Sequence, residues 1–80
     1  MVTTILRLPT VLHERGRSRS SHYQDIKQGL FTKSVVIGTR AVGWPTHEVT
    51  ALNRARIAGK SNEEIRVLVA NLEAARKFEE

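Results

Sequence analysis

The chain has 80 residues, with 13 Lys and Arg against 8 Asp and Glu for a net charge of +5, and it has no cysteine. A domain of this size leaves little room for an enclosed active site, so we expect neither an enzyme nor a bound cofactor. The lack of cysteine excludes disulfides and thiolate zinc sites, and no apolar run approaches the roughly 20 residues that span a bilayer. We therefore expect a cytoplasmic protein without a membrane partner.

The positive charge is confined to one part of the chain. Residues 1–45 contain seven Lys and Arg against two Asp and Glu and so hold the whole net charge, whereas residues 46–80 contain six of each sign. A basic half beside a neutral half suits an anionic partner that meets one end of the molecule, and a nucleic acid is the leading candidate. A basic surface that only keeps the protein soluble is the alternative.

Two short helices separated by a turn are predicted first. Residues 8–16 have a proline suited to a helix start, apolar side chains on one side and a glycine that ends the helix. The second helix has Ser18 as its N-cap and Gly29 at the left-handed stop position. We expect Ile26 and, in part, His22 and Tyr23 to face inward. This pattern predicts a helix-turn-helix, the unit that inserts a helix into the DNA major groove.

A β-hairpin is predicted next. Residues 35–37 are β-branched, residues 38–39 are a turn signal, and residues 41–44 return to an apolar strand before a proline. A hairpin beside a helix-turn-helix is a wing. We expect Phe31 and Trp44, at the ends of these segments, to fill a small core rather than to stack on bases.

Two further helices complete the predicted fold, which is mostly α with a small β-hairpin: a winged helix-turn-helix with an additional C-terminal helix. The third helix enters through residues 45–46 and closes at Gly59. Residues 61–64 have the form of a capping box and open the last helix. We divide the chain into a winged helix-turn-helix domain over 1–59 and a C-terminal amphipathic helix over 60–80, which either packs on that domain or mediates self-association. The apolar stripe of this helix comprises Ile65, Leu68, Leu72 and Ala75.

The candidate DNA-contacting residues lie on the second helix and around the hairpin. Long donors and short hydroxyls suit base readout, so Arg19, Ser20 and Gln24 are expected to face base edges. Phosphate contacts need donors that flank the helix, and Arg17, Ser18 and Lys27 supply them together with the helix N-terminus. Lys33 and Arg40 bracket the hairpin, where a wing reaches a minor groove or the backbone. The complete set is Arg17, Ser18, Arg19, Ser20, Ser21, Tyr23, Gln24, Lys27, Lys33 and Arg40.

No metal or catalytic site is expected from the sequence. His13, His22 and His47 fall on three different predicted helices without paired ligand spacing, and we interpret His22 as a half-buried packing residue. No serine has a base and an orienting acid nearby, and no glycine-rich loop fits a phosphate cradle.

Three residue runs carry a family resemblance. Residues 7–12 read Arg-Leu-Pro-x-Val-Leu, residues 16–20 read Gly-x-Ser-Arg-Ser, and residues 40–44 read Arg-Ala-Val-Gly-Trp. These runs, spread over about residues 5–57, resemble the AlpA family of prophage regulatory proteins. The resemblance implies a small winged-helix DNA-binding protein that regulates prophage genes or directs excision by an integrase. The family usually has apolar residues where Arg17 and His22 stand, and we expect His22 to loosen the packing under the recognition helix.

We therefore predict a sequence-specific, double-stranded DNA-binding prophage transcriptional regulator of the AlpA type. The first alternative is an excisionase, a recombination directionality factor that binds and bends attachment-site DNA. The second is a protein-interaction module that inhibits an acidic partner. The further partners that we consider are a second copy of the chain on DNA, an integrase and RNA polymerase.

Overall fold

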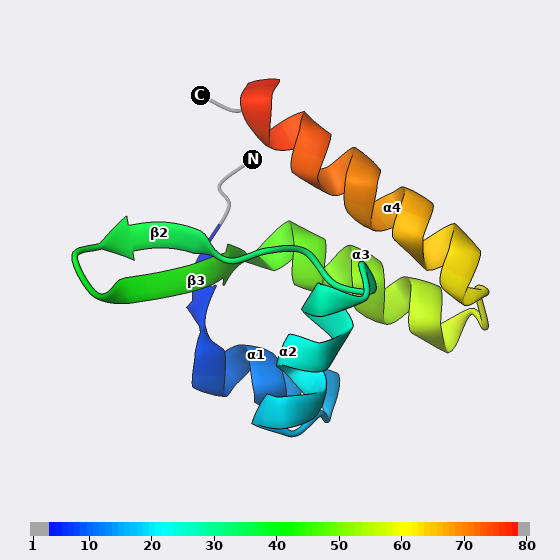
Figure 1. Cartoon of the computed structure of the whole chain (residues 1–80), viewed down its shortest axis with the longest axis horizontal. Helices are drawn as coiled ribbons and strands as arrows, with labels where there is room; N and C mark the ends of the chain where they lie inside the picture. Colours follow the sequence, from blue (N-terminus) through cyan, green and yellow to red (C-terminus); the bar gives the residue numbers. More distant parts are fainter. Residues whose placement is uncertain (1–3, 79–80) are drawn as a thin grey trace.

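The computed structural model describes residues 4–78, which form three strands, four α-helices and one 3-10 helix (Figure 1). Helices α1 and α2 lie on one side of α3 and α4 lies on the other, while the β2–β3 hairpin extends away from the helices. The predicted class, mostly α with a small sheet, is confirmed. The elements in chain order are β1 (Ile5–Arg7), α1 (Leu8–Arg15), α2 (Arg19–Lys27), β2 (Val35–Gly38), β3 (Ala41–Pro45), α3 (Thr46–Ile57), α4 (Asn62–Ala75) and η1 (Arg76–Phe78).

The helix-turn-helix forms where the sequence predicts it. A proline in the first turn starts α1, and α2 begins at its N-cap Ser18, whose hydroxyl accepts a hydrogen bond from the Ser21 backbone N–H at 3.2 Å. Gly29 follows α2 with a left-handed backbone, φ 78°, that other residues rarely adopt. The predicted cap and the predicted stop of the second helix are both confirmed.

The predicted hairpin is also confirmed, and it gains a third strand. Strands β2 and β3 pair antiparallel, with Val35 opposite Gly43. Strand β1 pairs antiparallel with the other edge of β3, with Arg7 opposite the same glycine, so the sheet order is β1-β3-β2. The sequence analysis missed β1 because three residues are too few to show the alternation of a strand.

The core lies between the helices and the inner face of the sheet, and its largest side chains are Trp44 and Phe31, at 0% and 1% exposure. The Trp44 indole N–H donates to the Thr32 carbonyl at 2.8 Å, which ties the core to the segment just before β2. The predicted role of both aromatics as core bulk is confirmed. The buried residues packed with them are Val11, Leu30, Val49, Leu52, Ala55, Ile65 and Val69.

Helix α4 packs on the rest of the chain. Its capping box forms as predicted, with reciprocal hydrogen bonds between Ser61 and Glu64. Two residues one turn apart, Ile65 and Val69, are buried in the core. The predicted stripe was wrong at Ala75, which is exposed. The buried residue Val69 was not part of the prediction.

Gly43 occupies the centre of the sheet, where the structure has no room for a side chain. A Cβ atom at this position would lie 2.6 Å from Ile5 Cγ2, 2.7 Å from Ile37 Cδ1 and 2.7 Å from the Leu6 carbonyl oxygen. The missing side chain therefore lets the two edge strands close over β3.

Replacing Gly43 by alanine is expected to destabilise the fold by about 1–3 kcal/mol, because the added methyl group overpacks the sheet against backbone as well as side chains. Denaturant unfolding of Gly43→Ala measures the loss. Gly38→Ala is the matched control, since a Cβ at Gly38 meets no atom within 4 Å. Equal losses in the two variants would show that the close approach at Gly43 is not the cause.

Candidate nucleic-acid interface

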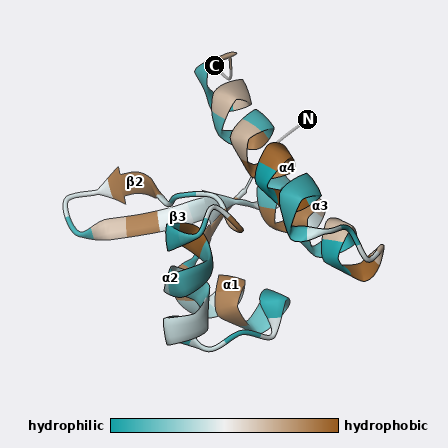
Figure 2. Cartoon of the chain, turned by 45° about the vertical axis from the view of Figure 1, so that its right-hand side comes forward, coloured by the Kyte–Doolittle hydropathy of each residue, from teal (hydrophilic) through white to brown (hydrophobic). Residues whose placement is uncertain are grey.

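Helix α2 divides into an exposed polar face and a buried face. Figure 2 shows it as mainly hydrophilic. His22 and Asp25, three residues apart, point into the protein. Tyr23, which we expected to face partly inward, is 41% exposed. The outward face predicted from the sequence is confirmed for Arg19, Ser20, Gln24 and Lys27, and Tyr23 joins it.

Asp25 is the one carboxylate of α2, and two arginines hold it beneath the helix. Arg15, at the end of α1, donates from Nη2 to Asp25 Oδ2 at 2.7 Å. Arg17, in the turn, donates from Nε to Oδ2 at 3.2 Å and from Nη2 to Oδ1 at 2.9 Å. The carboxylate is thus paired inside the protein, and the exposed face of α2 carries no negative charge. The sequence analysis did not identify this cluster, because Asp25 has no local signal of burial.

The residues at the start of α2 are partly engaged within the protein. Arg17, predicted to contact phosphate, forks onto Asp25 while its side chain stays 43% exposed. Ser18 and Ser21 bond to each other as well as forming the cap, with 3.0 Å between their hydroxyl oxygens. These three residues lie beside the exposed face, and their contacts with DNA stay predictions.

His22 is fully buried, not half-buried as we expected. Arg15 Nη1 lies 2.7 Å from His22 Nδ1, and because a guanidinium only donates, Nδ1 accepts and the ring proton sits on Nε2. The imidazole meets the rings of Tyr23, Phe31 and Trp44 edge to face, at centroid distances of 5.2, 5.1 and 4.8 Å. It therefore fills the space under α2 rather than loosening it. Burial, followed by the positive charge of Arg15, lowers the pKa of His22 to about 4.

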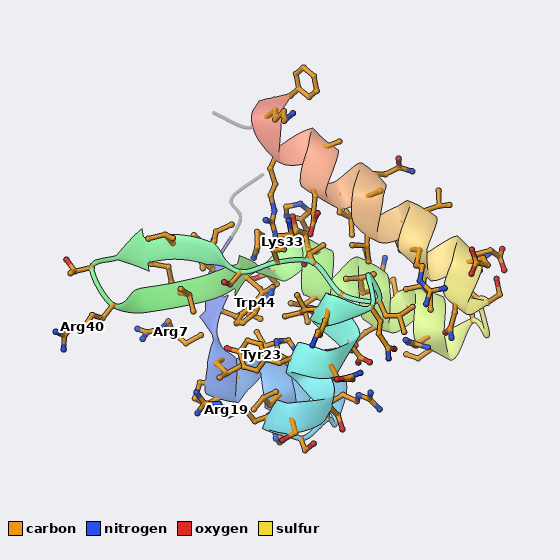
Figure 3. The ribbon with its side chains drawn as sticks, viewed as in Figure 1. Arg7, Arg19, Tyr23, Lys33, Arg40 and Trp44 are labelled. Carbon is orange, nitrogen blue, oxygen red and sulfur yellow. The ribbon has the colours of Figure 1, made fainter. Side chains whose placement is uncertain are left out.

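The wing and the adjoining strand β1 carry a second set of basic side chains. Arg40 is exposed in the turn between β2 and β3, and Figure 3 shows it at the far end of the hairpin. Arg7, exposed on β1, lies between Arg40 and Arg19 on the same side of the molecule. The sequence analysis did not select Arg7, because only the pairing of β1 with β3 brings it beside the wing.

The fold does not place Lys33 near the other residues predicted to contact DNA. It lies just before β2, at the root of the hairpin and on the side that faces α4, whereas Arg19 lies on the opposite side of the sheet (Figure 3). Both of its backbone polar groups are bonded to side chains from the end of the chain. The structure thus separates Lys33 from Arg40, although both flank the same hairpin in sequence.

A cleft of about 540 Å³ lies behind the turn between α1 and α2. Its two most buried charges, Arg15 and Asp25, bind each other.

Within residues 4–78, no three His, Cys, Asp or Glu side chains gather closely enough to hold a metal ion. None of the helices in that range is both long and apolar enough to cross a membrane.

Comparisons with known proteins find one family model and one phage relative. The family model described as "Prophage CP4-57 regulatory protein (AlpA)" matches residues 4–57. The chain is also similar to a protein of Enterobacteria phage P4 described as "Uncharacterized protein ORF88", with 46% identity over 55 residues. That alignment covers 69% of this chain and 62% of the phage protein, so the chain spans less than two thirds of its relative. No solved structure matches significantly.

Acid is expected to destabilise the protein through His22. The unfolded histidine takes up a proton near its ordinary pKa of 6.5, whereas the folded one resists protonation until about pH 4. The contribution of His22 to the free energy of unfolding is therefore fully present well above pH 6.5 and falls by up to about 3 kcal/mol as the pH drops towards 4. Denaturant unfolding across this range measures the slope.

The variant His22→Leu should flatten this pH dependence, even though it also removes the acceptor of Arg15 and lowers stability overall. His13→Gln removes an exposed histidine and serves as the control that keeps the slope. An unchanged slope in His22→Leu would assign the acid sensitivity to another group.

Proposed function

The chain belongs to the AlpA family of prophage regulatory proteins, and we propose that it is a transcriptional regulator that binds double-stranded DNA sequence-specifically. In this proposal α2 enters the major groove and the β2–β3 hairpin reaches an adjacent groove or the phosphate backbone. It would act in the cytoplasm, where prophage DNA is found.

The observation that carries the proposal is the exposed face of α2. This face presents donors without a carboxylate, because the acid of the helix is turned inward and paired. Arg19 suits the paired acceptors of guanine, Gln24 suits adenine, and Ser20 adapts to several bases. Lys27 and the helix N-terminus supply phosphate contacts.

The wing supports the same orientation on DNA. Arg40 and Arg7 lie on the side of the molecule that also presents Arg19 (Figure 3). Exposed arginines on a hairpin suit a narrow minor groove or the backbone beside it. We therefore add Arg7 to the residues proposed to contact DNA.

Regulation is preferred over the alternatives for specific reasons. The matched family is described as regulatory, whereas excision would use the same DNA-contacting surface with an integrase as partner. The donors on α2 would bind an acidic protein as well as DNA, and the family description gives regulation, not inhibition of a protein partner. Self-association on DNA, and contact with RNA polymerase, stay predictions. The apolar stripe of α4 does not require a second copy, because Ile65 is buried in the core and Leu68 and Leu72 pack against it.

Base readout is tested by Arg19→Ala on the preferred duplex, identified first by selection from a random pool. The change is expected to cost about 1–3 kcal/mol of binding free energy and to relax preference at one position. Lys27→Ala should weaken all sequences alike and lower the slope of log Kd against log salt by about 1. A wild-type protein that binds no duplex, or whose binding ignores salt, would refute the proposed function and favour a protein partner.

The wing contact is tested by Arg40→Ala. We expect binding to weaken by about 1 kcal/mol, because a DNA contact is lost. The unfolding free energy should change by less than about 0.5 kcal/mol, because the side chain is exposed. Lys60→Ala removes one positive charge from the turn between α3 and α4, away from the wing, and is the control for net charge. A large loss of stability in Arg40→Ala would make this residue structural.

A further inference from the structure

We propose that the C-terminal end of the chain sets the position of the wing for DNA binding, through a brace formed by Glu48, Glu73 and Arg76. The proposal rests on the proposed function, because the wing must contact DNA for its position to matter. It makes these three side chains positioning residues that do not touch DNA themselves.

The brace holds the chain just before it enters the wing. The backbone N–H of Lys33 donates to Glu73 Oε2 at 2.8 Å, and its carbonyl accepts from Arg76 Nη2 at 2.7 Å. Lys33 lies outside the strands and has no sheet partner for these groups. Two side chains 40 and 43 residues further along the chain thus provide the hydrogen bonds that a strand would otherwise supply.

The same arginine also holds the chain just after it leaves the wing. Arg76 Nε donates to Glu48 Oε2 at 2.8 Å and Nη2 to Glu48 Oε1 at 2.6 Å, a two-pronged pair. Glu48 lies in the first turn of α3, directly after β3, and its side chain is fully buried. One guanidinium therefore connects both ends of the hairpin.

The geometry gives the brace a mechanical role. Strand β1 supports β3 only as far as Gly43, so the outer part of the hairpin has two strands alone. An isolated two-stranded hairpin is only marginally stable in water. The orientation of this hairpin therefore depends on how its root, the base where β2 begins and β3 ends, is held by the rest of the protein. Trp44 holds the root from the core through the Thr32 carbonyl, and the brace holds it from the α4 side. The distance from Arg40 to the recognition helix follows from these ties.

Two of the three brace residues lie outside the segment shared with the family. The family match ends at residue 57, whereas Glu73 and Arg76 lie at the end of α4 and in η1. The brace is therefore built partly from a segment of this chain that the family model does not cover.

The brace is tested first in the free protein. Glu73→Ala removes the acceptor of the Lys33 amide, and amide hydrogen exchange followed by NMR is expected to accelerate at Lys33 at least about tenfold and to rise in β2. Glu63→Ala is the matched control: it removes an acid of equal charge from the other end of α4, where it pairs with Arg66. Unchanged exchange at Lys33 in Glu73→Ala would overturn the brace.

The positioning role is tested on DNA by double-mutant cycles. In the Glu73→Ala background, the factor by which Arg40→Ala raises Kd is expected to be at least about threefold smaller than in the wild-type background. The factor by which Arg19→Ala raises Kd is expected to be the same in both backgrounds. Arg76→Lys, which keeps the charge but not the fork, should act in the same direction. If Arg40→Ala costs the same in both backgrounds, the brace does not position the wing.

The hydrogen-exchange test and the double-mutant cycles test different parts of the proposal, so one can contradict it while the other supports it. If the wild-type protein binds no DNA, the proposed function and the positioning role both fall, while hydrogen exchange still decides whether the brace exists. If DNA binding is present and sensitive to Arg40 but the cycle shows no coupling, the function stands and only the positioning role is wrong.

Discussion

The pairing of the buried Asp25 carboxylate with two arginines is the interaction on which the half of the protein that we propose to face DNA depends. Removing a charge from water is costly, so the carboxylate is tolerated there only because Arg15 and Arg17 satisfy both of its oxygens. Arg15 also contacts His22, and its guanidinium carbon lies 4.0 Å from the centre of the Phe31 ring. One ion cluster thus links α1, the turn, α2 and the segment before the wing. It fixes how the two helices cross and therefore which face of α2 is exposed.

Two carboxylates, Asp25 and Glu48, are held inside the protein, while basic side chains stay exposed near the proposed DNA surface. Asp25 and Glu48 are both buried, and each pairs with arginine through charge-assisted hydrogen bonds. The paired Asp25 carboxylate therefore does not repel a phosphate that approaches α2. The basic side chains Arg7, Arg19 and Arg40 stay exposed on one side of the molecule. The net charge read from the sequence understates this separation, because it counts buried and exposed charges alike.

The two halves of the chain cooperate through the root of the wing. The helix-turn-helix is organised by the Asp25 cluster, and the hairpin is attached to it through Trp44, whose ring meets that of His22 at a centroid distance of 4.8 Å. Helix α4 adds hydrophobic burial through Ile65 and Val69 and hydrogen bonds through the brace. A chain of this length has little core to stabilise an exposed hairpin, so polar ties at its base have a large effect on its orientation.

The sequence by itself determined the local elements, because their signals act over a few residues. Ser18 and Gly29 mark the start and the end of α2, the β-branched run and turn signal predict the hairpin, and the capping box starts α4. The exposed face of α2 followed from the same helical spacing. Only the tertiary structure decided that Asp25 and His22 are buried, that Arg7 joins the wing side, and that Lys33 does not. The partners involved lie between 7 and 43 residues apart, and no local pattern records a contact over that distance.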